Sequence, residues 1–144
     1  MAYTYKYPRP ALTADCVVVT KEKEPRVLLI QRGNEPFKGR WAFPGGFLGM
    51  EESAEEGALR ELQEETGLKG AYIKQFHTFS DPNRDPRGRT VTVAYLAIVD
   101  APQPVVGQDD AAKAQWFAVS ALPLLAFDHA DILHDALILY NQCV

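Results

Sequence analysis

Apolar residues follow two different periods along the chain, and each period predicts its own kind of element. Runs rich in β-branched and other apolar residues predict strands. They are residues 11–20, 26–32, 71–80, 89–99 and 114–119. A charged turn that ends in Pro25 separates the first two runs, so these are expected to form a hairpin of central strands. A shorter strand is expected to begin at Trp41 and to end near Gly45 and Gly46.

The spacing becomes helical at two places. Ser53 with Glu56 three residues later forms a capping box, which is typical of a helix start, and Gly67 is typical of a helix end. Residues 128–142 place their apolar side chains on one face of a second helix. Strands interleaved with two helices predict an α/β fold in which helices cover a mixed β-sheet.

Composition limits the classes of protein that this chain can belong to. Its 144 residues, 47% of them hydrophobic and 24% charged, are typical of a single domain over residues 1–144. The net charge of -4 argues against nucleic acid as a partner. No apolar run approaches the roughly 18 residues of a membrane span, and the start lacks the apolar core of a signal peptide. Cys16 and Cys143 match no disulfide or zinc pattern, so a cytoplasmic protein without membrane contact is expected.

The negative charge is concentrated in one segment. Seven acidic residues and one arginine stand between Glu51 and Glu65, and the rest of the chain has 14 basic and 12 acidic residues. Glu61, Glu64 and Glu65 fall on one helix face. These acids could form an ordinary solvated face, with Arg60 paired to Glu56 and Glu64. Like charges this close repel, however, and one arginine cannot neutralise them all, whereas a bound divalent cation can.

The type of ligand then restricts the cation and its chemistry. Carboxylate oxygens select hard ions such as Mg²⁺ or Mn²⁺, which commonly share their coordination with water and substrate phosphates. Phosphoryl chemistry is the natural use of such a site. Gly45 and Gly46, just upstream, allow the backbone to come close to an ion or a phosphate.

These residues resemble a known family motif. Gly46, then Glu52 after five residues, then Arg60 to Leu68 after seven more match the Nudix box (residues 46–68) at every defining position. The resemblance implies the Nudix fold, an α/β/α sandwich with a mixed sheet. It also implies the hydrolysis of a nucleoside diphosphate linked to a variable group X, by attack of water on one phosphorus of the pyrophosphate.

The same resemblance implies roles for individual residues. Divalent ions, Mg²⁺ or Mn²⁺, would be held by the carboxylates of Glu61, Glu64 and Glu65 and the backbone carbonyl of Gly45. Arg60 would orient those carboxylates. Glu52 would be an auxiliary residue that binds metal or water. The general base would be either an acid outside the box, such as Asp110, or Glu64.

Specificity for X is expected from outside the box. Arg84, Arg87 and Arg89 concentrate positive charge in one loop, and the guanidinium group suits phosphate, so a substrate-binding loop is predicted. A plain polar loop is the alternative. Pro82, fifteen residues after Gly67, resembles a mark of the ADP-ribose pyrophosphatase branch, which implies ADP-ribose as substrate and AMP and ribose 5-phosphate as products.

Other functions stay open at this stage. The substrate could instead be an oxidised nucleoside triphosphate, a sugar nucleotide or a dinucleotide, or the domain could sense ADP-ribose and regulate a partner. An intact box argues against a purely sensory role. His129 is expected to cap or pack a helix start rather than to take part in chemistry. Residues 1–10 alternate tyrosines before two prolines and are expected to form an extended arm or edge strand, which favours a homodimer.

Overall fold

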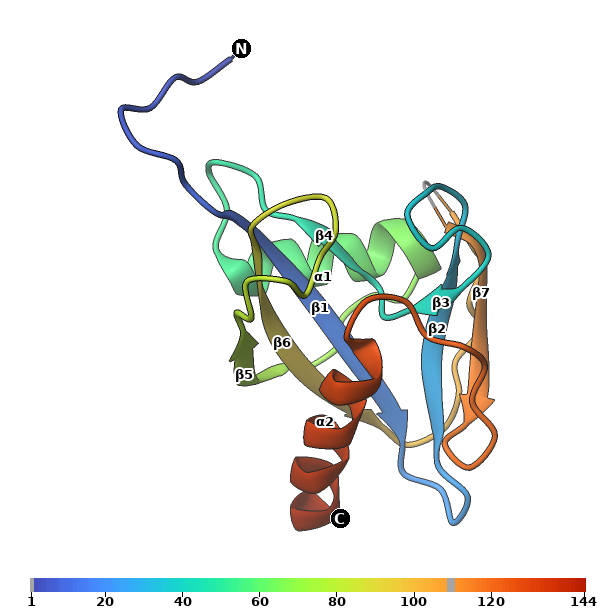
Figure 1. Cartoon of the computed structure of the whole chain (residues 1–144). Helices are drawn as coiled ribbons and strands as arrows, with labels where there is room; N and C mark the ends of the chain where they lie inside the picture. The colour runs from blue at the N-terminus through green and yellow to red at the C-terminus, as the bar shows by residue number, and fades with distance from the viewer. Residues whose placement is uncertain (1, 109–110) are drawn as a thin grey trace.

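The computed structural model describes residues 2–108 and 111–144 and places a mixed sheet at the centre (Figure 1). Its strands are β1 (Ala11–Thr20), β2 (Arg26–Arg32), β3 (Trp41–Ala42), β4 (Gly45–Phe47), β5 (Lys74–Phe79), β6 (Thr90–Val99) and β7 (Ala111–Ala118). The order in the sheet is β3-β2-β1-β6-β5, with β4 paired to β1 and β7 paired to β2. β1 runs parallel to β6 and antiparallel to β2 and β4. The predicted mixed sheet is confirmed.

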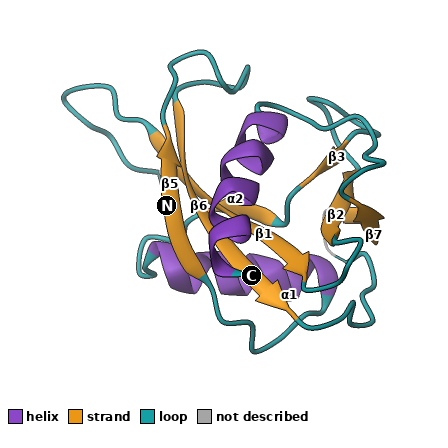
Figure 2. Cartoon of the chain, turned by 90° about the horizontal axis from the view of Figure 1, so that it is seen from below, coloured by secondary structure: helices purple, strands orange, loops and turns teal. Residues whose placement is uncertain are grey.

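Two helices cover opposite faces of this sheet (Figures 1 and 2). Side chains alternate along β1, so that Val17 and Val19 pack in the cluster with α2 (His129–Cys143). Cys16 and Val18 pack in the cluster with α1 (Ala54–Thr66). A strand that is apolar on both faces needs a cover on each side, and the result is the predicted α/β/α sandwich.

The first helix begins and ends where its sequence indicates. Ser53 is the N-cap, and its hydroxyl accepts a hydrogen bond from the Glu56 N–H while the Glu56 carboxylate accepts one from the Ser53 N–H. Gly67 closes the helix in the left-handed conformation, at φ 79°. Because Glu56 is engaged at the cap, the pair between Glu56 and Arg60 that an ordinary solvated face would include does not form among the described residues.

Some boundaries differ from those predicted. The run 71–80 begins its strand only at Lys74, the run 114–119 begins its strand already at Ala111, and the last helix spans His129–Cys143. Residues 2–10 have no strand partner among the described residues, so the tyrosine segment is an arm rather than an edge strand. No helix in the described part of the chain has the length and apolar character needed to cross a bilayer.

Candidate active site

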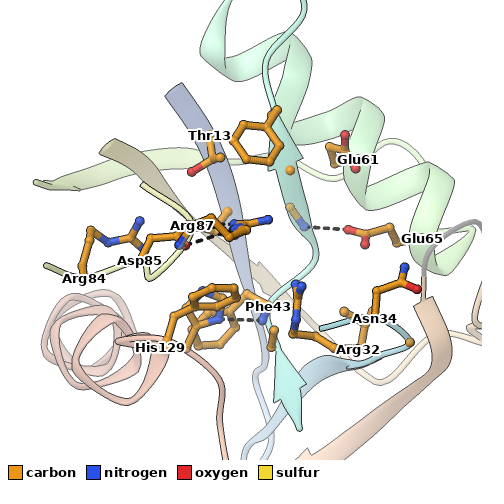
Figure 3. A pocket seen from close by; sticks show the side chains of 18 of the residues that line it. Thr13, Arg32, Asn34, Phe43, Glu61, Glu65, Arg84, Asp85, Arg87 and His129 are labelled. Carbon is orange, nitrogen blue, oxygen red and sulfur yellow. Dashed lines mark hydrogen bonds and ion pairs between the residues drawn. The ribbon is translucent and has the colours of Figure 1, made fainter. Parts of the chain in front are cut away.

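A cavity of about 360 Å³ opens where β1, β4, α1 and the start of α2 meet (Figure 3). The loops around residues 33–35 and 84–87 complete its wall. The polar side chains of the lining come from five segments of the chain: Thr13 and Asp15; Arg32, Asn34 and Glu35; Glu61 and Glu65; Arg84, Asp85 and Arg87; and His129. Figure 3 shows Glu61 and Glu65 on one side, with Arg84 and Asp85 across from them. The cavity therefore joins an acidic wall to a wall that carries arginines.

Arg60 is the hub of the acidic segment. Its guanidinium donates to both oxygens of Glu52, at 2.9 and 2.6 Å, and to Glu61 at 2.9 Å and Glu64 at 3.1 Å. It also donates to the carbonyl of Phe47 at 3.2 Å, which links the helix to β4. The hydrogen bonds from Arg60, and a further one from the Gly49 N–H, lower the pKa of Glu52 to about 2. One arginine thus holds the carboxylates of Glu52, Glu61 and Glu64, whereas the Glu65 carboxylate accepts from the Gly45 N–H instead.

The two glycines of β4 bring the backbone against the acidic helix. The Gly45 N–H donates to Glu65 at 2.7 Å, and Glu65 is buried. A Cβ at Gly46 would lie 2.7 Å from the Glu61 carboxyl carbon, so any side chain there would displace the Glu61 carboxylate. Glycine lets β4 and α1 approach this closely without moving the carboxylates. Glu61 and Glu65 therefore line the acidic wall of the cavity together.

The donor atoms suit a hard divalent ion. All are oxygens, from the carboxylates of Glu61, Glu64 and Glu65 and the carbonyl of Gly45. Within residues 2–108 and 111–144, however, no three acidic, histidine or cysteine side chains are clustered as a ready metal site. Arg60 draws Glu61 and Glu64 toward itself, Glu65 is held by the Gly45 N–H, and Glu64 lies outside the cavity lining in this arrangement. The donors fit the ion in chemistry, and their carboxylates must turn to bind it.

The three arginines of the loop have different positions. Arg87 lines the cavity, pairs with Asp85 at 2.7 Å, and lies 4.9 Å and 5.0 Å from the ring centres of Phe47 and Phe127. Arg84 also lines the cavity, but its guanidinium is buried in a pair with Asp128. Arg89 is exposed, donates to the Ser80 carbonyl and does not contribute to the lining.

The pair between Arg84 and Asp128 ties the loop to the start of α2. Two hydrogen bonds of 2.8 Å join them, and the Arg84 side chain is 4% exposed. Asp128, at the N-cap position, makes no capping hydrogen bond because its carboxylate is engaged by Arg84. Arg84 therefore has a structural role whatever it contributes to substrate binding.

We expect Arg84→Met to lower the free energy of unfolding by about 2–4 kcal/mol, because it removes a buried guanidinium and leaves the half-buried Asp128 carboxylate without its partner. Arg89→Met is the matched control. It removes one exposed hydrogen bond and should cost about 1 kcal/mol or less. Urea unfolding followed by circular dichroism measures both values. Equal stability of the two variants would contradict the structural role of the pair.

Several residues that line the cavity are not part of the family motif. Asp15 is a buried acid within an apolar strand, and its carboxylate accepts a 2.6 Å hydrogen bond from the Thr92 hydroxyl. Asp85 is nearly fully buried beneath Arg87. The signal that could have found Asp15 is its place in β1, where a lone charge interrupts apolar neighbours. Asp110, an acid predicted outside the box, and its neighbour Asp109 lie outside the described residues.

Comparison with known proteins gives a consistent assignment. The model of the NUDIX domain matches residues 9–136. An ADP-ribose pyrophosphatase from Methanocaldococcus jannaschii is 41% identical over 129 residues, which are 90% of this chain and 74% of that protein. An ADPR responsive transcriptional repressor, NtrR, from Acinetobacter baylyi is 36% identical over 141 residues. That match covers 94% of this chain, which spans only 56% of the repressor.

Two solved structures share the fold. The NUDIX domain of NrtR from Shewanella oneidensis, complexed with ADP ribose, has a TM-score of 0.85 and 36% identity, and the match covers 93% of this chain and 91% of that one. A bifunctional NMN adenylyltransferase/ADP ribose pyrophosphatase from Francisella tularensis, complexed with AMP and a Mn ion, has a TM-score of 0.80 and 27% identity. That match covers 97% of this chain and 44% of the other.

Proposed function

Since this chain belongs to the NUDIX family, we propose that it is a pyrophosphatase that hydrolyses ADP-ribose to AMP and ribose 5-phosphate in a reaction that depends on a divalent metal ion. The observation that carries the proposal is the cavity itself. Glu61 and Glu65 line one side of it, and the partly exposed guanidinium of Arg87 lines it from the 84–87 loop. A pyrophosphate needs cations on both sides, because its own charge is negative.

The oxygen atoms of the acidic wall would bind the metal ion in this reaction. Glu61, Glu64, Glu65 and the Gly45 carbonyl would hold Mg²⁺ or Mn²⁺, and a relative solved with a Mn ion agrees with this donor chemistry. Such an ion, when bound, neutralises phosphate oxygens and lowers the pKa of water. Arg60 orients the carboxylates of Glu61 and Glu64, and Glu52 in turn fixes Arg60.

The chemistry balances as one hydrolysis. The oxygen of a water molecule bonds to one phosphorus, and the bond from that phosphorus to the bridging oxygen breaks. A basic carboxylate, which we assign to Glu64 or to an acid outside the box such as Asp110, takes the proton of the water. The guanidinium of Arg87 is paired with Asp85 and would donate its remaining N–H groups to phosphate oxygens that face the loop. The side chain of Arg89 lies outside the cavity lining and donates to the Ser80 carbonyl, so a contact with the substrate stays a prediction for this residue.

A substrate panel tests the proposal. We expect ADP-ribose to have a higher kcat/KM than any nucleoside triphosphate, sugar nucleotide or dinucleotide, with activity in Mg²⁺ or Mn²⁺ and none in excess EDTA. Release of AMP and phosphate, the latter after phosphatase treatment, measures each rate. A triphosphate that is turned over faster than ADP-ribose would overturn the substrate, and full activity in EDTA would overturn the metal dependence.

A regulatory role is the second candidate, because one relative is a transcriptional repressor that responds to ADPR. In that case the domain binds ADP-ribose without turning it over. Calorimetric binding of ADP-ribose together with the absence of AMP release in Mn²⁺ would favour this role. Given that relative, the expectation that the chain does not bind nucleic acid stays a prediction, as does the homodimer.

A further inference from the structure

His129 is fixed in one tautomer by the backbone of the neighbouring strand segment. Its Nδ1 accepts a 3.1 Å hydrogen bond from the Phe43 N–H, drawn in Figure 3. An imidazole nitrogen that accepts carries no proton, so in the neutral ring the proton is on Nε2. The ring stacks on Phe43 at 5.1 Å between ring centres and lies 5.6 Å from the Phe127 ring, which holds its orientation.

The Nε2–H group is left for a ligand. His129 is 4% exposed and lines the cavity. Among the described residues, no fully buried side-chain nitrogen or oxygen lacks a hydrogen-bond partner, yet none of these residues bonds to Nε2. This atom must therefore open onto the cavity, where a substrate atom can accept its hydrogen bond.

Burial keeps this donor uncharged. It lowers the pKa of His129 below its usual value, and the positive charges of Arg84 and Arg32 act in the same direction, against Asp15 and Asp128. At neutral pH the ring is therefore a neutral donor. A neutral donor does not by itself select for a phosphate over an uncharged polar group.

An acceptor lies in the same part of the cavity. Asp15 is 7% exposed, and one of its oxygens accepts from the Thr92 hydroxyl at 2.6 Å. The absence of a side chain at Gly45 leaves room for the other oxygen, which a Cβ there would strike. Asp15 pairs with Gly45 in the sheet, two residues along the chain from Phe43, whose N–H binds the His129 ring. The cavity thus presents a donor and a carboxylate acceptor together.

The geometry points to a subsite in which His129 Nε2–H and Asp15 bind an uncharged group of the substrate that both accepts and donates hydrogen bonds. An ionised phosphate has no proton to donate to Asp15, whose carboxylate would repel it. Two parts of ADP-ribose have the required chemistry: a ribose hydroxyl, and the edge of adenine with its amino group. This subsite rests on the proposed function and specifies how the substrate is oriented within it.

Two substitutions of His129 separate the subsite from a structural role. Asn places an oxygen near the position of Nδ1, so His129→Asn keeps the acceptor for Phe43 and loses the donor. Gln places its amide nitrogen near the position of Nε2, so His129→Gln keeps the donor and loses the acceptor. For ADP-ribose binding in EDTA, where no turnover occurs, we expect His129→Asn to raise Kd about 5- to 20-fold and His129→Gln to change it less than threefold.

Stability is expected to follow the opposite order, with a lower Tm for His129→Gln than for His129→Asn. Asp15→Asn replaces an acceptor with a donor and should raise Kd by a factor similar to that of His129→Asn. If the His129 ring had only a structural role, His129→Gln would weaken ADP-ribose binding more than His129→Asn. Wild-type affinity in His129→Asn, with weak binding in His129→Gln, would therefore overturn the subsite.

Substrate analogues then identify the group that is bound. Three are compared: ADP-ribose with 2′-deoxyadenosine, ADP-ribose with a terminal 2-deoxyribose, and the hypoxanthine analogue. Wild-type protein should bind one of them about 10-fold more weakly than ADP-ribose, and His129→Asn should lose that discrimination. Equal discrimination by both proteins against all three analogues would overturn the subsite. Calorimetry in EDTA does not depend on catalysis, so failure of hydrolysis alone counts against the proposed function and not against the subsite.

Discussion

Glu64→Gln is expected to lower kcat by about 10²- to 10⁴-fold while leaving the fold intact. The change removes a negative oxygen from the metal donors and, if Glu64 is the base, also removes the proton acceptor. Its cost in stability is small, because the Glu64 side chain is 42% exposed and makes one 3.1 Å pair with Arg60. Surface pairs of this kind contribute about 0–1 kcal/mol. Loss of activity without unfolding is therefore the expected signature.

The matched control is Glu55→Gln, the same substitution on the same helix. Glu55 is exposed in the first turn of α1, and we assign it no role in the cavity. Its kcat should stay within twofold of the wild type. Single-turnover kinetics with ADP-ribose at saturating Mg²⁺, with Tm from circular dichroism, measures both variants. Near wild-type turnover by Glu64→Gln would show that Glu64 is neither a metal ligand nor the base.

Gly46→Ala is expected to lower kcat/KM by about 10- to 100-fold with a small change in Tm. The added Cβ would lie 2.7 Å from the Glu61 carboxyl carbon and Oε1 and so would push that carboxylate out of place. The displaced group is the flexible end of a side chain, so the strand need not move. A shift of about 1 Å at a catalytic group can reduce the rate by this amount.

Gly45→Ala gives the contrasting result. Its Cβ would strike the backbone carbonyl of Ala14 and the carboxylate of Asp15 in the paired strand, so the pairing of β4 with β1 must open. We expect a loss of stability of about 3 kcal/mol or more, measured by urea unfolding. Gly46→Ala with wild-type kcat/KM, or Gly45→Ala with wild-type stability, would contradict the close approach of β4 to its neighbours.

Local chemistry explains why much of the molecule could be predicted from its sequence. The capping box of Ser53 and Glu56 and the left-handed Gly67 delimit α1 through contacts within a few residues. Periodicity is local too, so that the hairpin of β1 and β2 and the helix beginning at His129 followed from it. The box residues around Arg60 form one helix and the turn before it, and their mutual contacts are close in sequence.

The strand boundaries needed tertiary information. The residues before Lys74 have a strand-like composition, but the ladder with β6 begins only at Lys74, opposite Leu96. Ala111 extends β7 because Arg32 of β2 lies opposite it, 79 positions earlier in the chain. Propensity cannot predict these ends, because pairing across the sheet decides them.

The sequence by itself determined the family motif, the acidic helix and the choice of hard metal ions. The tertiary structure decided which side chains share the cavity. It buried Arg84 against Asp128, placed Arg87 at the cavity and Arg89 outside its lining, and brought Asp15 and His129 to the same cavity. The physical reason is distance along the chain. The residues of the motif contact one another within one helix and its adjoining loop, whereas the hydrogen bond from Phe43 to His129 joins residues 86 positions apart. Only packing of the sheet against α2 creates that contact.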